Sequence, residues 1–554
     1  MEDAAWAGVM PIVHDFPAPL RVEQSRGLRH GDRRKFARLR PGGFGMTHGR
    51  KHRVLLINAY FDPWRMATPT RLFVPRAMAP YMLAGYFDAT QCEVRVWDEA
   101  FHGAMLDPAL FAWPDMVVIS GLTAAFDRAR QLAAYCRHAN PRVITVIGGP
   151  IPRALPGICA DVFDYACMGD VEEIASLIEA TLGPDAVQLD GAPRFDLTAP
   201  KLGLGFVETT KNCNFACAFC SLTGENRAYV AHSDASITRQ LDAMGKVPIV
   251  MVLDNNFFGS NRRSYEHRVE LLGERWRSGQ FRGWGALVTG DFFKRPANLE
   301  LAAKNGCIGL FSGVESLDPE ILQGFNKKQS LSSDPLSLAQ ACAEHGIAFD
   351  YGLIFDFARQ TIAEVDAQMD RLISDHRMPL PALASLAIPI AGTPMFDEAV
   401  QSQRIMPGVL LSDMDGQKLV EWPQDPVEKV VPFFQRLLRM QGRRTALARH
   451  VVRHAWHWRR HLPIETTLLS LVRPLHRFGP RIGVGSLAQM RQSWREPKLT
   501  YCAMTDRPRL AYQPIHHMPD RFRADFEPLV VTDAKGALTD TFEAARTAPL
   551  AQVV

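Results

Sequence analysis

The stretch "KNCNFACAFCSLTG", residues 211–224, places three of the chain's ten cysteines within eight positions. They are Cys213, Cys217 and Cys220, spaced Cys-x3-Cys-x2-Cys, and they follow the strand-like run "GFVETT". A structural zinc site is normally closed by four ligands, whereas three thiolates leave one position open. Such a loop after a strand can hold three corners of a [4Fe-4S] cube and leave one iron free for a small molecule. The alternative is that the three thiols are simply buried or bind zinc.

The composition is that of a large globular protein. At 554 residues the chain exceeds what one hydrophobic core supports, so several domains are expected. It has 47% hydrophobic and 22% charged residues and no apolar run of membrane-spanning length, which indicates a soluble protein. The acidic opening "MEDAAWAGVMPIVHDF" lacks the order of a signal peptide, so we expect a cytoplasmic location. The scattered cysteines are expected to be small buried hydrophobes: Cys92, Cys136, Cys159, Cys167, Cys307, Cys342 and Cys502.

The first half of the chain is expected to contain an extension and one α/β domain. Residues 1–50 are rich in Arg, Gly and Pro and lack apolar periodicity, which is typical of an extension. Over residues 51–185, apolar runs such as "RVLLINAY" and "DMVVISGL" alternate with helix-length segments. This alternation predicts a doubly wound, Rossmann-like parallel sheet covered by helices. Residues 186–200 have the Pro, Gly and Asp content of a linker.

A second α/β series is expected over residues 201–400, followed by a mainly helical, Arg-rich region at 401–554. About six strand and helix pairs predict a partial (β/α)6 barrel, whose functional residues lie at the carboxyl ends of the strands. Polar residues occupy those expected ends: Thr209, Asp254, Asn255, Thr289, Asp291, Glu315 and Ser316.

The cysteine loop and the strand ends resemble the radical S-adenosylmethionine (SAM) enzymes. The resemblance rests on "FVETTKNCNFACAFC", with the aromatic Phe219 before the last cysteine, and on "LDNNFF", "LFSGVES" and "PIAGTPMF" in that order. It implies a [4Fe-4S] cluster on Cys213, Cys217 and Cys220 that cleaves SAM to a 5'-deoxyadenosyl radical. It places Glu315 and Ser316 near SAM, and Asp254 and Asn255 at a cofactor or substrate contact. For Glu315 and Asp254 the alternative role is helix capping.

The preceding domain resembles the cobalamin-binding domains found before many radical SAM cores. Ser120 and Leu122 follow one expected strand and Gly148 and Gly149 follow the next, where open parallel sheets bind ligands. The resemblance implies that these four residues line the slot for the dimethylbenzimidazole tail of cobalamin. "DYACMGD" matches a segment in which relatives carry Glu at the position of Asp170. The cobalt-ligating pattern Asp-x-His-x-x-Gly is missing, because Asp98 and His102 in "DEAFHG" are four apart. The alternative is a degenerate domain that has lost cobalamin.

Together these features resemble the cobalamin-dependent radical SAM methyltransferases over residues 51 to about 400. The resemblance implies methylation of an unactivated carbon in a lipid or natural product, with one SAM supplying the methyl group and another the radical. An electron donor such as flavodoxin or ferredoxin is then expected. The alternatives are a rearrangement, cyclisation or oxidation without methyl transfer, and a non-catalytic cofactor-binding scaffold.

The Arg-rich segment between Gln435 and Arg495 contains thirteen arginines, no lysine and a single acid, Glu465. It also contains Trp456 and Trp458 among Leu and Val residues. Three interpretations are open: a helical face packed on the barrel, a phosphate-binding surface, or a basic amphipathic helix on an anionic membrane. Nucleic acid binding is the weakest alternative, because no RNA-binding module accompanies the arginines.

Overall fold

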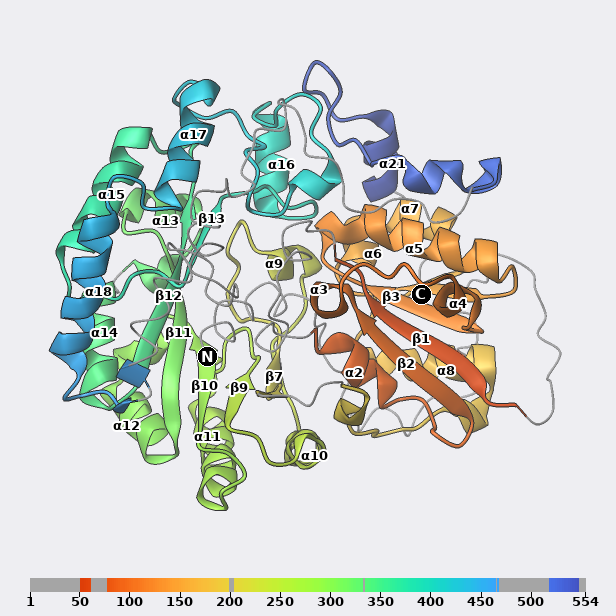
Figure 1. Cartoon of the computed structure of the whole chain (residues 1–554), viewed down its shortest axis with the longest axis horizontal. Helices are drawn as coiled ribbons and strands as arrows, with labels where there is room; N and C mark the ends of the chain where they lie inside the picture. The colour runs from red at the N-terminus through yellow and green to blue at the C-terminus, as the bar shows by residue number, and fades with distance from the viewer. Residues whose placement is uncertain are drawn as a thin grey trace.

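The computed structural model describes residues 50–60, 77–198, 204–331, 334–464, 466–467 and 518–547. Two α/β domains lie side by side, one on each half of the view in Figure 1. The expected extension at residues 1–50, apart from Arg50, and Cys502 lie outside the described residues.

The first domain is a five-stranded parallel sheet in the order β2-β1-β3-β4-β5. The order reverses between β1 and β3, so the sheet is doubly wound as the sequence predicted. The strands coincide with the apolar runs: β1 (His52–Asn58), β2 (Cys92–Asp98), β3 (Met116–Ser120), β4 (Ile144–Ile147) and β5 (Tyr165–Ala166). Its helices are α2 (Ala79–Ala84), α3 (Glu99–His102), α4 (Pro108–Ala112), α5 (Phe126–Ala139), α6 (Ile151–Ala154), α7 (Pro156–Val162) and α8 (Ile174–Leu182).

The second domain is a six-stranded parallel sheet in which each strand pairs with the next one in this domain, in the order β13-β12-β11-β10-β9-β6. Sequential parallel neighbours joined by helices make an open half-barrel, and the expected (β/α)6 architecture is confirmed. The strands are β6 (Gly205–Val207), β9 (Ile249–Val252), β10 (Gly283–Val288), β11 (Cys307–Glu315), β12 (Ala348–Phe355) and β13 (Leu383–Leu386). The helices are α9 (Ser221–Glu225), α10 (Asp234–Met244), α11 (Arg262–Arg277), α12 (Pro296–Lys304), α13 (Pro319–Gly324), α14 (Pro335–Glu344), α15 (Ile362–Ser374) and α16 (Pro394–Gln401).

A short antiparallel hairpin interrupts the barrel after its first strand. β7 (Thr210–Lys211) pairs with β8 (Val230–Ala231), and the three cysteines lie in the loop between them. The hairpin and α9 lie between the barrel and the first domain (Figure 1). The cysteine loop therefore begins and ends beside the neighbouring domain.

The C-terminal region is helical where it is described, and it contacts both domains. α17 (Val427–Leu437) and α18 (Arg444–Trp458) lie on the barrel side, next to α15 (Figure 1). α21 (Asp540–Thr547) packs against α7 of the first domain. In the described residues no helix has both the length and the apolar character needed to cross a membrane.

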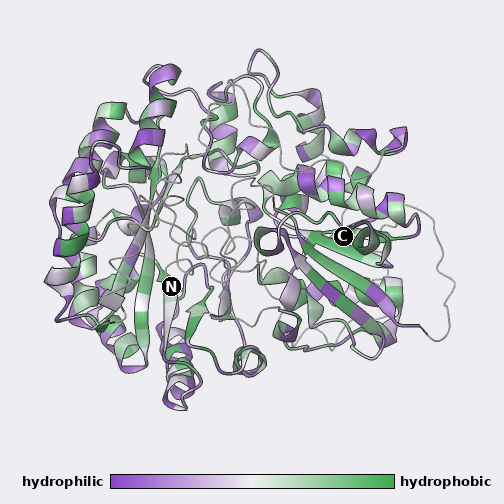
Figure 2. Cartoon of the chain, viewed as in Figure 1, coloured by the Kyte–Doolittle hydropathy of each residue, from purple (hydrophilic) through white to green (hydrophobic). Residues whose placement is uncertain are grey.

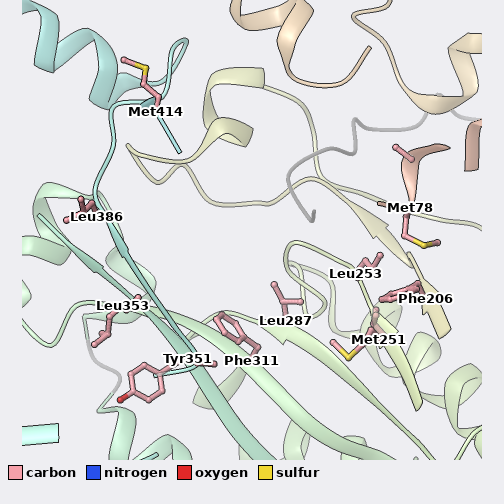
Figure 3. Packing of buried hydrophobic residues seen from close by; sticks show 14 of the residues in the cluster. Met78, Phe206, Met251, Leu253, Leu287, Phe311, Tyr351, Leu353, Leu386 and Met414 are labelled. Atoms are coloured by element: carbon pink, nitrogen blue, oxygen red, sulfur yellow. The ribbon is translucent and has the colours of Figure 1, made fainter. Parts of the chain in front are cut away.

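The core is continuous across the domain boundary. Hydrophobic residues are concentrated in the strands, whereas the outer helices mix hydrophobic and hydrophilic positions (Figure 2). One buried cluster includes Leu55 of the first sheet, Phe311 of the barrel and Leu529 of the C-terminal region. Met78 of the first domain belongs to the same buried cluster as Phe206 and Met251 of the barrel (Figure 3). Since apolar burial is the main stabilising term in folding, the two domains form one body.

The described scattered cysteines are buried, apart from the partly exposed Cys167, so they fit the expected role of small hydrophobes. The domain boundaries that the sequence indicated stay predictions.

Candidate functional site

The three cysteines of the loop lie together at the carboxyl end of the barrel's first strand. Cys217 is buried, and Cys213 and Cys220 are partly buried. Burial raises the pKa of the Cys213 thiol to about 12 and raises the pKa of the other two thiols above the ordinary value. Each thiol lies close enough to another thiol and to Lys327 for their charges to interact. Because iron binds thiolates, the loop offers buried soft ligands beside a compensating cation.

Among the described residues, no three His, Cys, Asp or Glu side chains converge as ligands of one metal ion. Three thiols could hold three corners of a [4Fe-4S] cluster and leave the fourth iron without a protein ligand. The assignment of Cys213, Cys217 and Cys220 to a cluster, with zinc as its alternative, stays a prediction.

Contacts from distant segments fix the loop. Ala218 donates its N–H to the carbonyl of Phe325 and accepts a hydrogen bond from the N–H of Met395. The Gln329 side chain donates to the Cys217 sulfur at 3.3 Å. Phe219, the aromatic residue of the motif, packs edge-on against Phe325. The loop is therefore held in place by the segments after β11 and β13.

Glu315 at the end of β11 forms a buried ion pair with Lys327, with 2.8 Å between Oε1 and Nζ. Burial alone would lower the pKa of Lys327, but the carboxylate of Glu315 raises that pKa above its ordinary value. The close approach needs Gly313, because a Cβ there would lie 2.2 Å from Glu315 Oε1. Glu315 itself adopts the left-handed conformation, at φ 63°. This pair places one carboxylate and one ammonium group beside the thiols, which matches the charges of an amino acid moiety.

The other expected residues lie at strand ends as predicted, in two kinds of environment. Asp254 is fully buried and accepts hydrogen bonds from the backbone N and the hydroxyl of Thr209. Ser316 accepts a hydrogen bond from the N–H of Asp318. Asn255 differs, because its buried Nδ2 has no hydrogen-bond partner. Since a buried donor without a partner is costly, Asn255 is the strand-end residue whose geometry best fits a ligand contact.

The alternative of helix capping is wrong for both acids, since Asp254 binds Thr209 and Glu315 binds Lys327 in the described structure. The roles of Glu315, Ser316, Asp254 and Asn255 toward a cofactor stay predictions.

The glycines of the first domain lie at the sheet edge where the resemblance places the cobalamin tail. Ser120 ends β3, and Gly148 and Gly149 follow β4 at the same edge of the sheet. A Cβ on Gly148 would meet no atom within 4 Å, so open space lies beside it. By contrast, a Cβ on Gly121 would lie 2.7 Å from the Ala59 carbonyl. Ser120, Leu122, Gly148 and Gly149 thus lie at the ends of neighbouring strands, where open parallel sheets bind ligands, and their contact with cobalamin stays a prediction.

The His102 side chain contacts neighbouring residues of its own segment. Its Nδ1 lies 3.0 Å from the backbone N and 3.1 Å from the carbonyl of Asp98, and its ring contacts those of Trp97 and Phe101. Asp98 caps α3 through the N–H of Ala100. The sequence spacing that made His102 unsuitable as a cobalt ligand thus corresponds to a helix-capping segment.

Sequence reasoning missed Lys327 and Gln329, which lie more than one hundred positions after the cysteines they accompany. It also missed Lys211 and Arg227, which flank the loop and form ion pairs with the first domain. The only sequence signal for Lys211 was its position two residues before Cys213.

Comparison with known proteins supports this picture. Residues 70–179 match the B12 binding domain family. A bacteriochlorophyllide d C-12(1)-methyltransferase of Chlorobaculum tepidum is 26% identical over 366 residues, covering 61% of this chain and 75% of the relative. An uncharacterized methyltransferase of Pyrococcus horikoshii is 22% identical over 367 residues, covering 58% of this chain and 75% of the relative.

A solved structure extends the comparison to the fold. The cobalamin-dependent S-adenosylmethionine radical enzyme OxsB, with aqua-cobalamin and S-adenosylmethionine bound, has a TM-score of 0.53 and 15% identity, covering 80% of this chain and 79% of OxsB. Cobalamin and SAM are two of the three cofactors expected from the sequence. The resemblance drawn from the motifs is confirmed: residues 70–179 match a B12 binding domain, the curated relatives are methyltransferases, and the fold is similar to that of a cobalamin-dependent radical SAM enzyme.

Proposed function

We propose that this enzyme methylates an unactivated carbon of a lipid or natural product. The observation that carries the proposal is that a three-thiol loop lies in the hairpin of β7 and β8, whose Lys211 and Arg227 pair with acids of the domain that matches the B12 binding family. The similarity to a bacteriochlorophyllide d C-12(1)-methyltransferase of Chlorobaculum tepidum also supports it. When bound, the cluster would supply the electron that cleaves SAM, and cobalamin would supply the methyl group.

The chain's own residues would bind and orient these groups. Cys213, Cys217 and Cys220 would hold three irons, and the Lys327 and Glu315 pair would hold the amino acid part of SAM near the fourth. Asn255 would donate from Nδ2 to SAM or substrate. The buried apolar residues of the strands would keep water away from a reactive carbon.

The test is anaerobic reconstitution with iron, sulfide and hydroxocobalamin, followed by reduction and incubation with SAM and candidate substrates. We expect cluster and cobalamin absorbance, 5'-deoxyadenosine, S-adenosylhomocysteine and a product heavier by one methyl group. A Cys217→Ala variant should lose 5'-deoxyadenosine, whereas Cys342→Ala, a change at a buried cysteine of α14, should keep it. Formation of 5'-deoxyadenosine with unmethylated product would favour a rearrangement, cyclisation or oxidation. Absence of 5'-deoxyadenosine from the loaded enzyme would favour a non-catalytic scaffold.

We also propose two partners. A one-electron donor such as flavodoxin or ferredoxin would reduce the cluster. The outer face of α18 would contact an anionic membrane, because Arg449 and Arg453 are exposed there beside the 67% exposed Trp456. Co-sedimentation with phosphatidylserine vesicles should fall with added salt and with Trp456→Ser. No binding to these vesicles at low salt would overturn the membrane contact.

A further inference from the structure

Two cations flank the cysteine loop and reach across to the first domain. Lys211 ends β7 two residues before Cys213, and its Nζ lies 2.7 and 2.8 Å from the carboxylate oxygens of Glu172. Arg227 follows α9, and its Nη1 lies 2.6 Å from Oδ1 of Asp170. Both acids belong to the segment after β5, the last strand of the cobalamin-type sheet. The two ion pairs thus tie each end of the cluster loop to the other cofactor domain.

The pairs are largely removed from water. The side chains of Lys211 and Asp170 are each 1% exposed and that of Arg227 is 13% exposed, whereas that of Glu172 is 31% exposed. Although burial raises the pKa of Glu172, the neighbouring Lys211 ammonium lowers it below the ordinary value. Removing one partner of a buried pair leaves an uncompensated charge, which is far more costly than losing an exposed pair. These contacts therefore restrict relative movement of the two domains.

A third connection runs close to the cobalamin-type slot. Arg153 lies in α6, which begins two residues after Gly149. Its Nη1 donates to the carbonyl of Glu225 at 3.4 Å, and its Nη2 donates to the carbonyl of Met168. Arg153 therefore links the helix behind the glycines to the end of α9, inside the hairpin that carries the thiols.

We propose that Lys211 and Arg227 are positioning residues that set the separation and orientation between the cluster and the cobalamin. The inference rests on the proposed function, because a methyl group can pass between the two sites only when both are held at reacting geometry. A misplacement of about 1 Å can lower the rate of such a transfer by roughly a hundredfold. Neither residue touches the reacting atoms, so each acts through the position of the loop it flanks.

The test uses holoenzyme carrying both cofactors, with variants Lys211→Met and Arg227→Gln. Pulsed dipolar electron paramagnetic resonance measures the distance between the reduced cluster and cobalt(II) in cobalamin. We expect one narrow distance distribution for the native chain and a broader or shifted one for each variant. The exchanged pair Lys211→Glu with Glu172→Lys should restore the narrow distribution. An unchanged distribution in both single variants would overturn the inference.

A control is available in an exposed ion pair between the barrel and the expected linker that follows the first domain. Arg239 of α10 pairs with Asp190 at 3.2 Å, but the two side chains are 37% and 65% exposed. An exposed pair contributes little, so Arg239→Met should keep the native distribution. If Arg239→Met broadened the distance distribution as much as Lys211→Met, loss of any ion pair of the barrel with the preceding segments would have the same result. The specific positioning role of Lys211 would then be wrong.

Chemistry provides a second readout with SAM as the only substrate. With titanium(III) citrate as reductant, SAM gives its methyl group to cobalt(I) of reduced cobalamin and leaves S-adenosylhomocysteine. In a separate reaction, one electron breaks the C5'–S bond of SAM to leave methionine and the 5'-deoxyadenosyl radical, and this radical takes a hydrogen atom from a C–H bond of a buffer component to give 5'-deoxyadenosine. We expect S-adenosylhomocysteine to fall about tenfold in Lys211→Met, while 5'-deoxyadenosine is retained. Equal loss of both products would overturn the positioning role in favour of simple damage to the cluster loop. If the native enzyme formed no S-adenosylhomocysteine, the proposed methyl transfer would be wrong. The positioning role of Lys211 and Arg227 would still be decided by the distance measurement.

Discussion

At the scale of single residues, Gly148 is the position where a side chain should interfere most selectively with cobalamin. Its Cβ would stand in open space at the end of β4, so Gly148→Val can fold without a clash. The added methyl groups would occupy the slot, and overpacking of a site costs roughly 1–3 kcal/mol. We expect the dissociation constant for hydroxocobalamin to rise about tenfold, measured by absorbance titration, with an unchanged melting temperature of the unloaded chain.

The control for this change is Gly324→Val at the end of α13, where the nearest atom to an added Cβ lies 3.7 Å away. It should leave cobalamin affinity unaltered. Native affinity in Gly148→Val would show that the tail binds elsewhere.

The sequence predicted the site residues unevenly, for physical reasons. Cys213, Cys217 and Cys220 were predictable because a continuous loop encodes their spacing. Lys327 was not, because its adjacent residue Lys328 has the same chemistry and only tertiary packing buries the first and exposes the second. The unpaired Nδ2 of Asn255 is likewise a property of packing. Local patterns thus indicated the candidate cluster ligands, whereas the charged groups around them could be found only from the fold.

At the scale of elements, α18 shows what the Arg-rich segment does in the described residues. Its inner face packs on the barrel through Leu447 and Val451, and Trp458 donates from Nε1 to the carbonyl of Arg377 at 2.9 Å. This inner face of α18 agrees with the interpretation of the segment as a helical face packed on the barrel. Composition alone could not decide between packing on the barrel and binding of phosphate or membrane, because it does not show which face of a helix is covered. The exposed arginines on the other face of α18 can still contact an anionic surface.

The docking of α18 should depend on pH through His454. This buried residue shares a hydrogen bond between Nδ1 and the carbonyl of His376, at 2.9 Å. Burial lowers the pKa of His454 to about 4. The unfolded chain binds the proton near pH 6.5 and the folded chain does not, so stability is fully present above pH 6.5 and is lost as the pH falls toward 4. The loss amounts to about 1.4 kcal/mol for each pH unit in that window.

The measurement is the free energy of unfolding by urea at pH 7 and pH 5 for the native chain and His454→Gln. Glutamine keeps a donor for the carbonyl of His376 and does not titrate. We expect the variant to lose less stability than the native chain between the two pH values. Equal losses in the two proteins would assign the acid sensitivity to other groups.

At the scale of the whole molecule, the C-terminal segment 518–547 joins the two α/β domains. Val531 donates its N–H to the carbonyl of Val409, beyond the barrel, at 2.7 Å, and Leu529 donates its N–H to Asp127 of α5 at 3.1 Å. Arg546 of α21 forms an ion pair with Asp397 of α16 at 3.0 Å. These contacts join residues 122 to 402 positions apart, which explains why no local pattern in the sequence predicted them. The hairpin of β7 and β8 connects the two domains at one place. Segment 518–547 connects them at another.

Arg130 is the residue whose loss should release this segment. It lies in α5, is 5% exposed, pairs with Asp127, and donates from Nη1 to the carbonyl of Ala524 at 3.0 Å and from Nη2 to that of Glu527 at 2.5 Å. Arg130→Met would leave a buried carboxylate without its cation, at a cost of about 3 kcal/mol.

We expect faster hydrogen exchange across 518–547 and in α7 of the Arg130→Met variant, with native exchange in β9 to β12. Arg142→Met, a change at an exposed arginine of the same domain, should alter neither region. Uniformly faster exchange throughout the barrel would instead mean that the segment supports the whole fold, and native exchange across 518–547 would mean that Arg130 does not hold it.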